Sequence, residues 1–191
     1  MSKNIFLWFF CLLPFSEAIS LESSIEPSVY FSSEIDLSKK FIELIKNEPA
    51  KIRMATERLS DVEVVQALIA AHKRGVSVEV IVDPVTVTSR SPLALLVEER
   101  IPVFVWKPDE TFSKTKKNET KRRMHQVFCV FGSSLSWTGS YSFSLKRLFS
   151  HRESALVLQD EKVSAAFISE FERMKVTNTT VLSASSQGKK I

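Results

Sequence analysis

The stretch from Met124 to Leu158 carries the side chains of this sequence that are best suited to chemistry. In chain order they are a histidine, a glycine–serine pair, a further serine and an acid: His125, Gly139, Ser140, Ser142 and Glu153. An imidazole that a carboxylate orients can act as a nucleophile or as a general base. We therefore expect His125 and Glu153 to meet beside the glycine–serine turn, where an anionic group could dock.

Basic side chains gather directly before His125. The segment 107–123 has little apolar periodicity, and after Lys107 it carries Lys114, Lys116, Lys117, Lys121, Arg122 and Arg123. A charged loop of this kind is usually a solvated surface. Its place next to the histidine favours a loop that faces an anion, because an arginine fork fits the oxygens of a phosphate.

These residues resemble the motif of the phospholipase D superfamily, which reads His-x-Lys-x4-Asp-x6-Gly-Ser-x-Asn and is followed by a Glu in a later strand. His125, Gly139 and Ser140 match the motif, and Glu153 falls where the family has its downstream acid. The resemblance extends over about residues 25 to 175 and follows the order of the small bacterial endonuclease-type members. The chain is therefore similar to the single-motif branch of this superfamily, and we expect the phospholipase D-like fold.

Three positions depart from the family pattern. Val127 stands at the lysine position, Gly132 at the aspartate position and Ser142 at the asparagine position. In the family the lysine and the asparagine bind the non-bridging phosphate oxygens. Val127 has no donor, and Ser142 can donate only through its hydroxyl. Loss of one preorganised donor typically lowers a rate by about 10²–10³, so the degenerate motif predicts weak hydrolysis or none.

The resemblance implies a phosphodiesterase that needs neither a metal nor another cofactor. His125 would attack phosphorus, Glu153 would orient its ring, and the histidine of a second motif would protonate the leaving oxygen. The chain has one motif and no internal repeat, so the resemblance also implies a homodimer with a shared cleft. The residues expected to hold the substrate are Gly139, Ser140, Ser142, Arg122 and Arg123.

Two classes of function remain open. One is a phosphodiesterase that acts on a phospholipid headgroup or on nucleic acid. The other is a non-catalytic module that binds anionic lipid, nucleic acid or a protein partner. The net charge of +4 and the pI near 9.1 permit contact with phosphates or with an anionic membrane surface without requiring it. A zinc site is not expected, because the histidines and cysteines do not follow a zinc-binding spacing.

The hydrophobic periodicity predicts an α/β domain in which helices flank a mixed sheet. Strands are expected at 28–31, 51–55, 76–82, 101–106, 126–131, 135–138 and 154–158. Helices are expected at 37–46, from a capping box at Ser60 and Glu63 to a stop at Gly75, after Ser91-Pro92, and through 163–171. Cys129 lies in an apolar alternating run and is expected to be a small buried side chain.

The two ends of the chain differ from this domain. Lys3, the apolar run from Ile5 to Phe15 and the sequence Ser16-Glu17-Ala18 form the pattern of a secretory signal peptide over residues 1–18. An uncleaved anchor is the alternative. We expect an exported protein, periplasmic or secreted, with its phospholipase D-like domain at 25–175. The Ser/Thr/Lys-rich residues 176–191 are expected to be a disordered tail.

Overall fold

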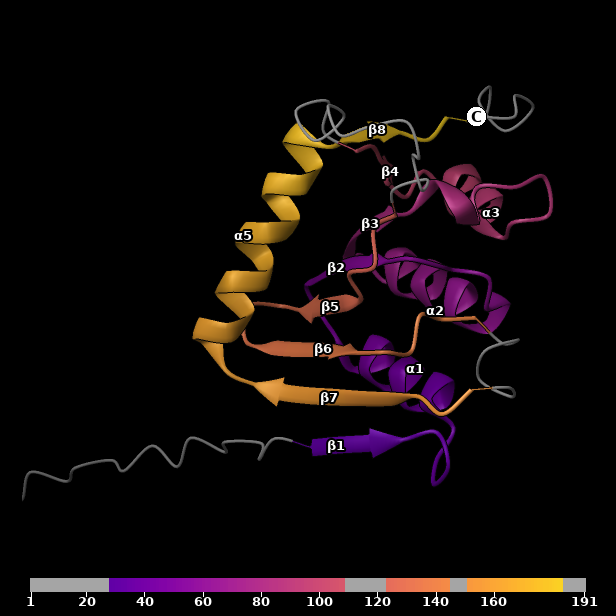
Figure 1. The fold of residues 1–191 in the computed structure, drawn as a ribbon. Coiled ribbons are helices and arrows are strands. Elements are labelled where there is room, and N and C mark those ends of the chain that lie inside the picture. Colours follow the sequence, from indigo (N-terminus) through magenta and orange to yellow (C-terminus); the bar gives the residue numbers. More distant parts are fainter. Residues whose placement is uncertain (1–27, 109–122, 145–150, 184–191) are drawn as a thin grey trace, which may run out of the picture.

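The computed structural model describes residues 28–108, 123–144 and 151–183. They form a mixed 8-stranded sheet with the order β1-β7-β6-β5-β2-β3-β4-β8. Figure 1 shows β1 and β8 at opposite ends of this stack of strands. Strands β2, β3 and β4 are parallel to one another, and every other neighbouring pair is antiparallel. The α/β prediction with a mixed sheet is confirmed.

The elements alternate along most of the chain. The strands are β1 (Ser28–Phe31), β2 (Lys51–Thr56), β3 (Ser77–Val82), β4 (Val103–Trp106), β5 (Phe128–Phe131), β6 (Leu135–Gly139), β7 (Ser154–Gln159) and β8 (Thr179–Val181). The helices are α1 (Leu37–Asn47), α2 (Val62–Lys73), α3 (Leu93–Glu98) and α5 (Glu161–Thr177), with a 3-10 turn η1 at Pro84–Thr86. Each strand predicted from the sequence is present, with ends that differ by one or two residues.

The larger core lies between the sheet and the helices α1, α2 and α3. Its centre is an aromatic cluster in which the ring of Phe41 lies 5.2 Å from that of Trp137 and 4.3 Å from that of Phe143. Cys129 is fully buried in the same core, as predicted, and burial followed by the charge of Glu48 raises the pKa of its thiol. A thiol held in this way is a packing group, because the thiolate is disfavoured there.

Helix α5 covers the other face of the sheet (Figure 1). Phe171 and Met174 pack with the strand residues Ala55, Ile81 and Phe128 in a second, smaller core. Charged side chains extend this contact: Arg53 binds Glu172 at 3.1 Å, and Glu79 binds Lys51 at 3.0 Å and also Lys175. The helix is therefore fixed to the sheet by apolar packing and by a half-buried ionic network.

The helix starts follow the predicted chemistry with one correction. Asp61, not Ser60, is the N-cap of α2, and its carboxylate accepts hydrogen bonds from the amides of Glu63 and Val64. An aspartate at this position also places negative charge at the positive end of the helix. Ser91 and Pro92 do lie at the start of α3, as predicted, although the hydroxyl of Ser91 accepts only a long bond of 3.4 Å from Leu93.

The C-terminal end is more ordered than the sequence indicated. Helix α5 continues to Thr177, and β8 then pairs with β4 in an antiparallel register. The prediction that the chain is disordered from residue 176 is therefore wrong for residues 176–183. β8 provides hydrogen-bond partners for the backbone at the edge of β4. The next residue, Leu182, is buried, and its amide donates to the carbonyl oxygen of Val103. The predicted signal peptide at 1–18 and residues 184–191 lie outside the described residues.

Across the described ranges, no helix is both long and apolar enough to cross a bilayer. α5 is the longest helix at 17 residues, and it carries charged side chains throughout.

Candidate functional site

Several of the predicted site residues lie along one edge of the sheet. Because β5 and β7 run opposite to β2 and β6, the beginnings of β5 and β7 lie beside the ends of β2 and β6. His125 comes just before β5, Gly139 ends β6, Glu153 precedes β7 and Glu57 follows β2. Residues far apart in the sequence are thus gathered along this edge, which we call the motif edge.

The carboxylate that approaches His125 belongs to Glu57. Its Oε1 lies 3.8 Å from Nδ1 of His125 and 3.9 Å from a terminal nitrogen of Arg123. Glu57 is buried, whereas the imidazole of His125 is 72% exposed. The histidine contact is longer than the range of about 2.7–3.2 Å typical of hydrogen bonds with an N–H donor, so it is an electrostatic contact. The exposed ring leaves Nε2 accessible from solvent.

Glu153, the predicted partner of His125, lies at the same edge on a strand further away. β5 and β7 are separated by β6, and two inter-strand steps span about 10 Å. The backbone of Glu153 exchanges hydrogen bonds with Ser32 at the end of β1, and its side chain is buried. The pairing of His125 with Glu153 stays a prediction, while Glu57 is a candidate that the sequence did not indicate.

Gly139 is required by the close approach of two backbones. A Cβ at this position would collide with the carbonyl oxygen of Ser154 and lie 2.9 Å from Cα of Ala155. The next residue, Ser140, is exposed, and its hydroxyl accepts a hydrogen bond of 3.0 Å from the amide of Ser154. The glycine–serine pair of the motif therefore joins the end of β6 to the start of β7.

The loop after this pair is anchored in the core. Ser142 is fully buried, so its hydroxyl does not lie on the surface of the site. The carbonyl oxygen of Phe143 accepts hydrogen bonds from the amides of Ser60 and Asp61. Tyr141 donates its hydroxyl to Asp61 at 3.3 Å, and burial followed by the charge of Asp61 raises the pKa of this phenol strongly. The start of α2 thus holds the loop in place.

Two of the replaced motif positions, Val127 just before β5 and Gly132 just after it, lie at opposite edges of the sheet. Val127 is at the motif edge and is buried in the larger core, so its own side chain supplies no donor at the family's lysine position. Gly132 lies in the turn between β5 and β6, at the opposite edge, with a φ of 60°. A Cβ there would lie 3.5 Å from the carboxylate of Glu48. Glycine suits the positive φ of this turn. Because the turn lies at the edge opposite His125, an aspartate at position 132 would not lie beside the histidine.

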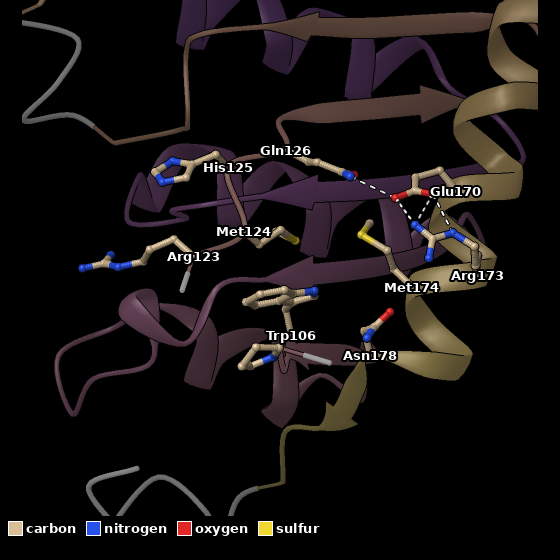
Figure 2. Close-up of a pocket in the computed structure, with 10 residues that line it drawn as sticks. Trp106, Arg123, Met124, His125, Gln126, Glu170, Arg173, Met174 and Asn178 are labelled. Carbon is tan, nitrogen blue, oxygen red and sulfur yellow. Dashed lines mark hydrogen bonds and ion pairs between the residues drawn. The ribbon is translucent and has the colours of Figure 1, made fainter. Parts of the chain in front are cut away.

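A cavity of about 520 Å³ opens between the segment before β5 and the C-terminal half of α5. Figure 2 shows Gln126 pointing toward Glu170 and Arg173, while the side chains of His125 and Arg123 point the other way. The residues that line the cavity are Trp106, Pro108, Arg123, Met124, His125, Gln126, Glu170, Arg173, Met174 and Asn178. We call it the α5 cavity.

A hydrogen-bonded cluster forms one wall of the α5 cavity. Glu170 accepts hydrogen bonds from Gln126 at 2.9 Å and from both the Nε and a terminal nitrogen of Arg173 (Figure 2). Burial opposes ionisation of Glu170, but these donors outweigh it and lower the pKa of its carboxyl group. The carboxylate neutralises much of the charge of Arg173. Among the residues that line the cavity, Arg123 and His125 are therefore better placed than Arg173 to bind an anion.

The structure also places the remaining predicted residues. Arg122 and most of the basic segment before it lie outside the described residues. Within the ranges 28–108, 123–144 and 151–183, no group of three His, Cys, Asp or Glu side chains is placed to hold a metal ion. Met124, beside Arg123, is fixed through its amide, which donates to the buried carboxylate of Asp83 at 2.7 Å.

The comparison with protein families decides the identity of the domain. A family model described as "Cardiolipin synthase, PLD-like domain" matches residues 41–175. The chain belongs to this PLD-like domain family. No curated protein matches the chain in sequence. The resemblance to the phospholipase D superfamily that the motif indicated is confirmed.

Solved structures show the same fold. Nuc from Salmonella typhimurium, a phospholipase D family member, has 21% identity and a TM-score of 0.69, over 83% of this chain and 100% of its own. NucT from Helicobacter pylori has 16% identity and a TM-score of 0.69, over 81% and 98%. TrmBL2, an archaeal chromatin protein with a novel mode of DNA binding, has 15% identity and a TM-score of 0.52, over 81% and 55%. The PLD-like fold extends along the whole of Nuc, so this chain corresponds to one such domain.

Glu57 is the site residue that sequence reasoning missed. It follows a buried strand directly, and acids at the ends of such strands are candidates for a site at the sheet edge. Its nearness to His125 depends on the pairing of β2 with β5, which are separated by two other strands in the sequence. Glu170 and Arg173 were not singled out in the sequence analysis. Their approach to Gln126 depends on how α5 crosses the sheet.

Proposed function

We propose that the protein binds a phosphodiester at the motif edge and hydrolyses it weakly without a metal, with His125 as the nucleophile. The observation that supports this is the buried carboxylate of Glu57, which contacts both the exposed imidazole of His125 and the guanidinium of Arg123. A carboxylate on one side of an imidazole fixes the orientation of the ring and stabilises its positive charge as the other nitrogen reacts.

In the proposed reaction Nε2 of His125 forms a bond to phosphorus and the bond from phosphorus to the leaving oxygen breaks. The leaving oxygen takes a proton from the His125 of a second copy of the chain. Water, deprotonated by that same second histidine, then attacks phosphorus, and the bond to Nε2 breaks. Arg123 would balance the charge of the non-bridging oxygens, because a guanidinium can bind them through two donors.

The activity is proposed to be weak because one strong donor is missing. Val127 occupies the lysine position and is buried among apolar side chains, so it adds no donor to the site. Removing one preorganised donor typically costs about 10²–10³ in rate. Ser142 is also buried. Arg123, which contacts the same Glu57 carboxylate as His125, is then the cation that we assign to the phosphate.

A non-catalytic binding module is the second candidate. It is favoured by Val127 and Ser142, which leave the site without the two ligands that the family uses for the phosphate. In that case Arg123, His125 and the basic segment before them bind an anionic lipid or nucleic acid without cleaving it. Both ligand classes are in view, because the family model is named for a cardiolipin synthase and TrmBL2 is described as binding DNA.

One assay separates the two candidates. The purified protein is incubated with chelator and with either labelled phospholipid or labelled single- and double-stranded DNA, next to His125→Ala and the matched surface variant His151→Ala. Turnover that persists with chelator, is lost in His125→Ala and is kept in His151→Ala supports the enzyme. Equal background turnover in all three proteins, together with binding that weakens as salt rises, supports the binding module.

Two further features are part of this proposal. The protein acts as a homodimer, since a single motif supplies only one of the two histidines that the reaction needs. It is exported through the leader at residues 1–18, to a periplasm or out of the cell, and its basic surface contacts anionic membranes. The leader is supported by its sequence pattern alone.

A further inference from the structure

The two residues of the candidate site lie on separate loops. Glu57 comes just after β2 and His125 just before β5, and the contact of 3.8 Å between Oε1 and Nδ1 joins them. Such a contact keeps its distance only if both loops are fixed relative to each other. The turn after β3, formed by Asp83 and the 3-10 turn η1, lies between them in the structure, and both Asp83 and Thr86 are buried. We call it the β3 turn.

The carboxylate of Asp83 binds the loop that carries His125. Its Oδ2 accepts a hydrogen bond of 2.7 Å from the amide of Met124, the residue directly before the histidine. Its Oδ1 accepts a hydrogen bond of 2.8 Å from the amide of Val85, which fixes the carboxylate within its own turn. Met124 is buried in the smaller core, and Figure 2 shows its side chain and that of His125 pointing in opposite directions. The bond from Met124 therefore fixes the backbone from which the exposed imidazole projects.

The same turn binds the loop that carries Glu57. The amide of Asp83 donates to the carbonyl oxygen of Thr56 at 3.3 Å. The hydroxyl of Thr86 accepts a hydrogen bond of 3.1 Å from the amide of Leu59 and donates to the carbonyl oxygen of the same residue at 3.4 Å. Thr56 and Leu59 lie on either side of Glu57 in the chain, so the backbone that carries the glutamate is held on both sides.

These hydrogen bonds explain why an aspartate stands at position 83. A carboxylate accepts at both of its oxygens, whereas an asparagine accepts at one oxygen and presents donors at the other end. Because Val85 and Met124 donate to different oxygens, an asparagine could accept from only one of them. Asparagine caps a helical turn about as well as aspartate. The second acceptor, which binds Met124, is therefore what distinguishes the aspartate here.

We propose that Asp83 is a positioning residue of the candidate site, which sets the separation of Glu57 and His125. It binds the amide before the histidine from a turn that also holds the loop of the glutamate. Its carboxylate is buried and accepts from two backbone amides, so it acts through these loops and not on the substrate. This inference rests on the proposed function, because the pair that Asp83 positions is the pair to which we assign the reaction.

A double-mutant cycle tests this role by measuring the coupling between Glu57 and His125. The nitrogen chemical shifts of the His125 ring are recorded at constant pH in a histidine-labelled protein, with and without Glu57→Gln. In the wild type, Glu57→Gln is expected to move these shifts. In Asp83→Asn the same change is expected to move them by less than about half as much, because the two loops are no longer held together. The rings of His72 and His151 serve as references in the same spectra.

Asp160→Asn is the matched control. Asp160 is the N-cap of α5, and its carboxylate accepts from the amides of Lys162 and Val163. It lies beside the turn between β5 and β6, at the edge opposite the motif edge, where its amide donates to the carbonyl oxygen of Ser134. The substitution removes the same charge from the start of a helix without touching either loop. The coupling between Glu57 and the histidine ring should keep its wild-type size.

Thr86→Val tests the other arm of the β3 turn and serves if Asp83→Asn does not fold. It keeps the shape of the side chain but leaves the amide of Leu59 without its acceptor, so it too is expected to reduce the coupling. The inference is overturned if the coupling keeps its wild-type size in these variants, or if Asp160→Asn reduces it equally. It is also overturned if Glu57→Gln does not move the ring shifts in the wild type.

Turnover gives a separate result. In the assay described above, Asp83→Asn is expected to lower turnover about 10²-fold, the loss that a displacement of about 1 Å can cause. Reduced coupling with unchanged turnover contradicts the proposed function and leaves the positioning role of Asp83 standing. Unchanged coupling in Asp83→Asn overturns the positioning role, whatever the turnover.

Discussion

The contact between Glu57 and His125 changes which carboxylate is expected to matter. Family resemblance pointed to Glu153, which lies on β7, whereas Glu57 follows β2, the strand that pairs directly with β5. Both carboxylates are buried at the motif edge. A buried acid beside an exposed imidazole is the arrangement that can orient the ring for attack.

We expect Glu57→Gln to change the environment of the His125 ring, because the amide removes the negative charge 3.8 Å from Nδ1. Glu153→Gln is the matched control at the same edge. The measurement is the nitrogen chemical shifts of the imidazole in a histidine-labelled protein. A shift in Glu153→Gln with none in Glu57→Gln would restore Glu153 as the partner of the ring.

Gly139 is expected to resist even the smallest substitution. Gly139→Ala introduces a Cβ that collides with the backbone of Ser154, and overpacking of this kind costs about 1–3 kcal/mol or more. Gly75→Ala is the comparison, because its φ is 95° but nothing lies within 4 Å of the added carbon. Chemical denaturation should show the larger loss for Gly139→Ala. Equal losses would mean that β7 moves aside and that the close approach is not a constraint.

Helix α5 both packs against the sheet and lines the cavities beside it. Its buried face covers the sheet, and one flank forms walls of both the α5 cavity and an apolar groove beside Phe128 and Thr138. The ionic network around Glu79 fixes the helix to β2 and β3. Burial disfavours the charge of Glu79, but the hydrogen bonds from Lys175 and Lys51 outweigh it and lower the pKa of this carboxyl group.

A lowered pKa makes this network sensitive to acid. Its contribution to stability is full above the ordinary carboxyl value of 4.5 and is lost as pH falls through the lower pKa of the folded protein. We expect Glu79→Gln to cost about 1–3 kcal/mol at neutral pH, because charged donors lose their acceptor. The difference from the wild type should shrink below pH 4.5.

The measurement is the free energy of unfolding in urea across that pH range, with the exposed Glu98→Gln as control. A difference between wild type and Glu79→Gln that stays constant from neutral to acid pH would show that the network does not respond to protonation.

The local elements could be predicted from the sequence, and their long-range contacts could not. Alternating apolar residues identified β5 and β6 because side chains on opposite faces of a strand follow a period of two. The strand β8 was missed because Thr179–Val181 is short and lies in a polar segment. The sequence indicated His125 and the Gly139-Ser140 pair, and the fold places both at the motif edge. Glu57 was not, since its position depends on pairing between strands distant in the sequence.

The proposed homodimer rests on the single motif of the chain. If two copies share one site, as proposed, light scattering at micromolar concentration should give twice the chain mass. His125→Ala should keep that mass, because an exposed imidazole contributes little to an interface. Mixing the wild type with an excess of His125→Ala should lower turnover more than dilution alone does, because each mixed dimer keeps only one of the two histidines that the proposed reaction needs. A monomeric mass with full turnover would show that one copy is sufficient.

The place of β1 at the end of the sheet has a consequence for biosynthesis. β1 is the first described element of the chain, yet it pairs only with β7, one of the last. During synthesis β1 therefore has no pairing strand until nearly all of the described chain has been made. Pairing between strands so distant in the sequence is slow. Val29 and Phe31 stay largely exposed even in the finished fold. Until β7 has been made, β1 therefore lacks its strand partner, and an unpaired apolar strand can pair wrongly with other chains.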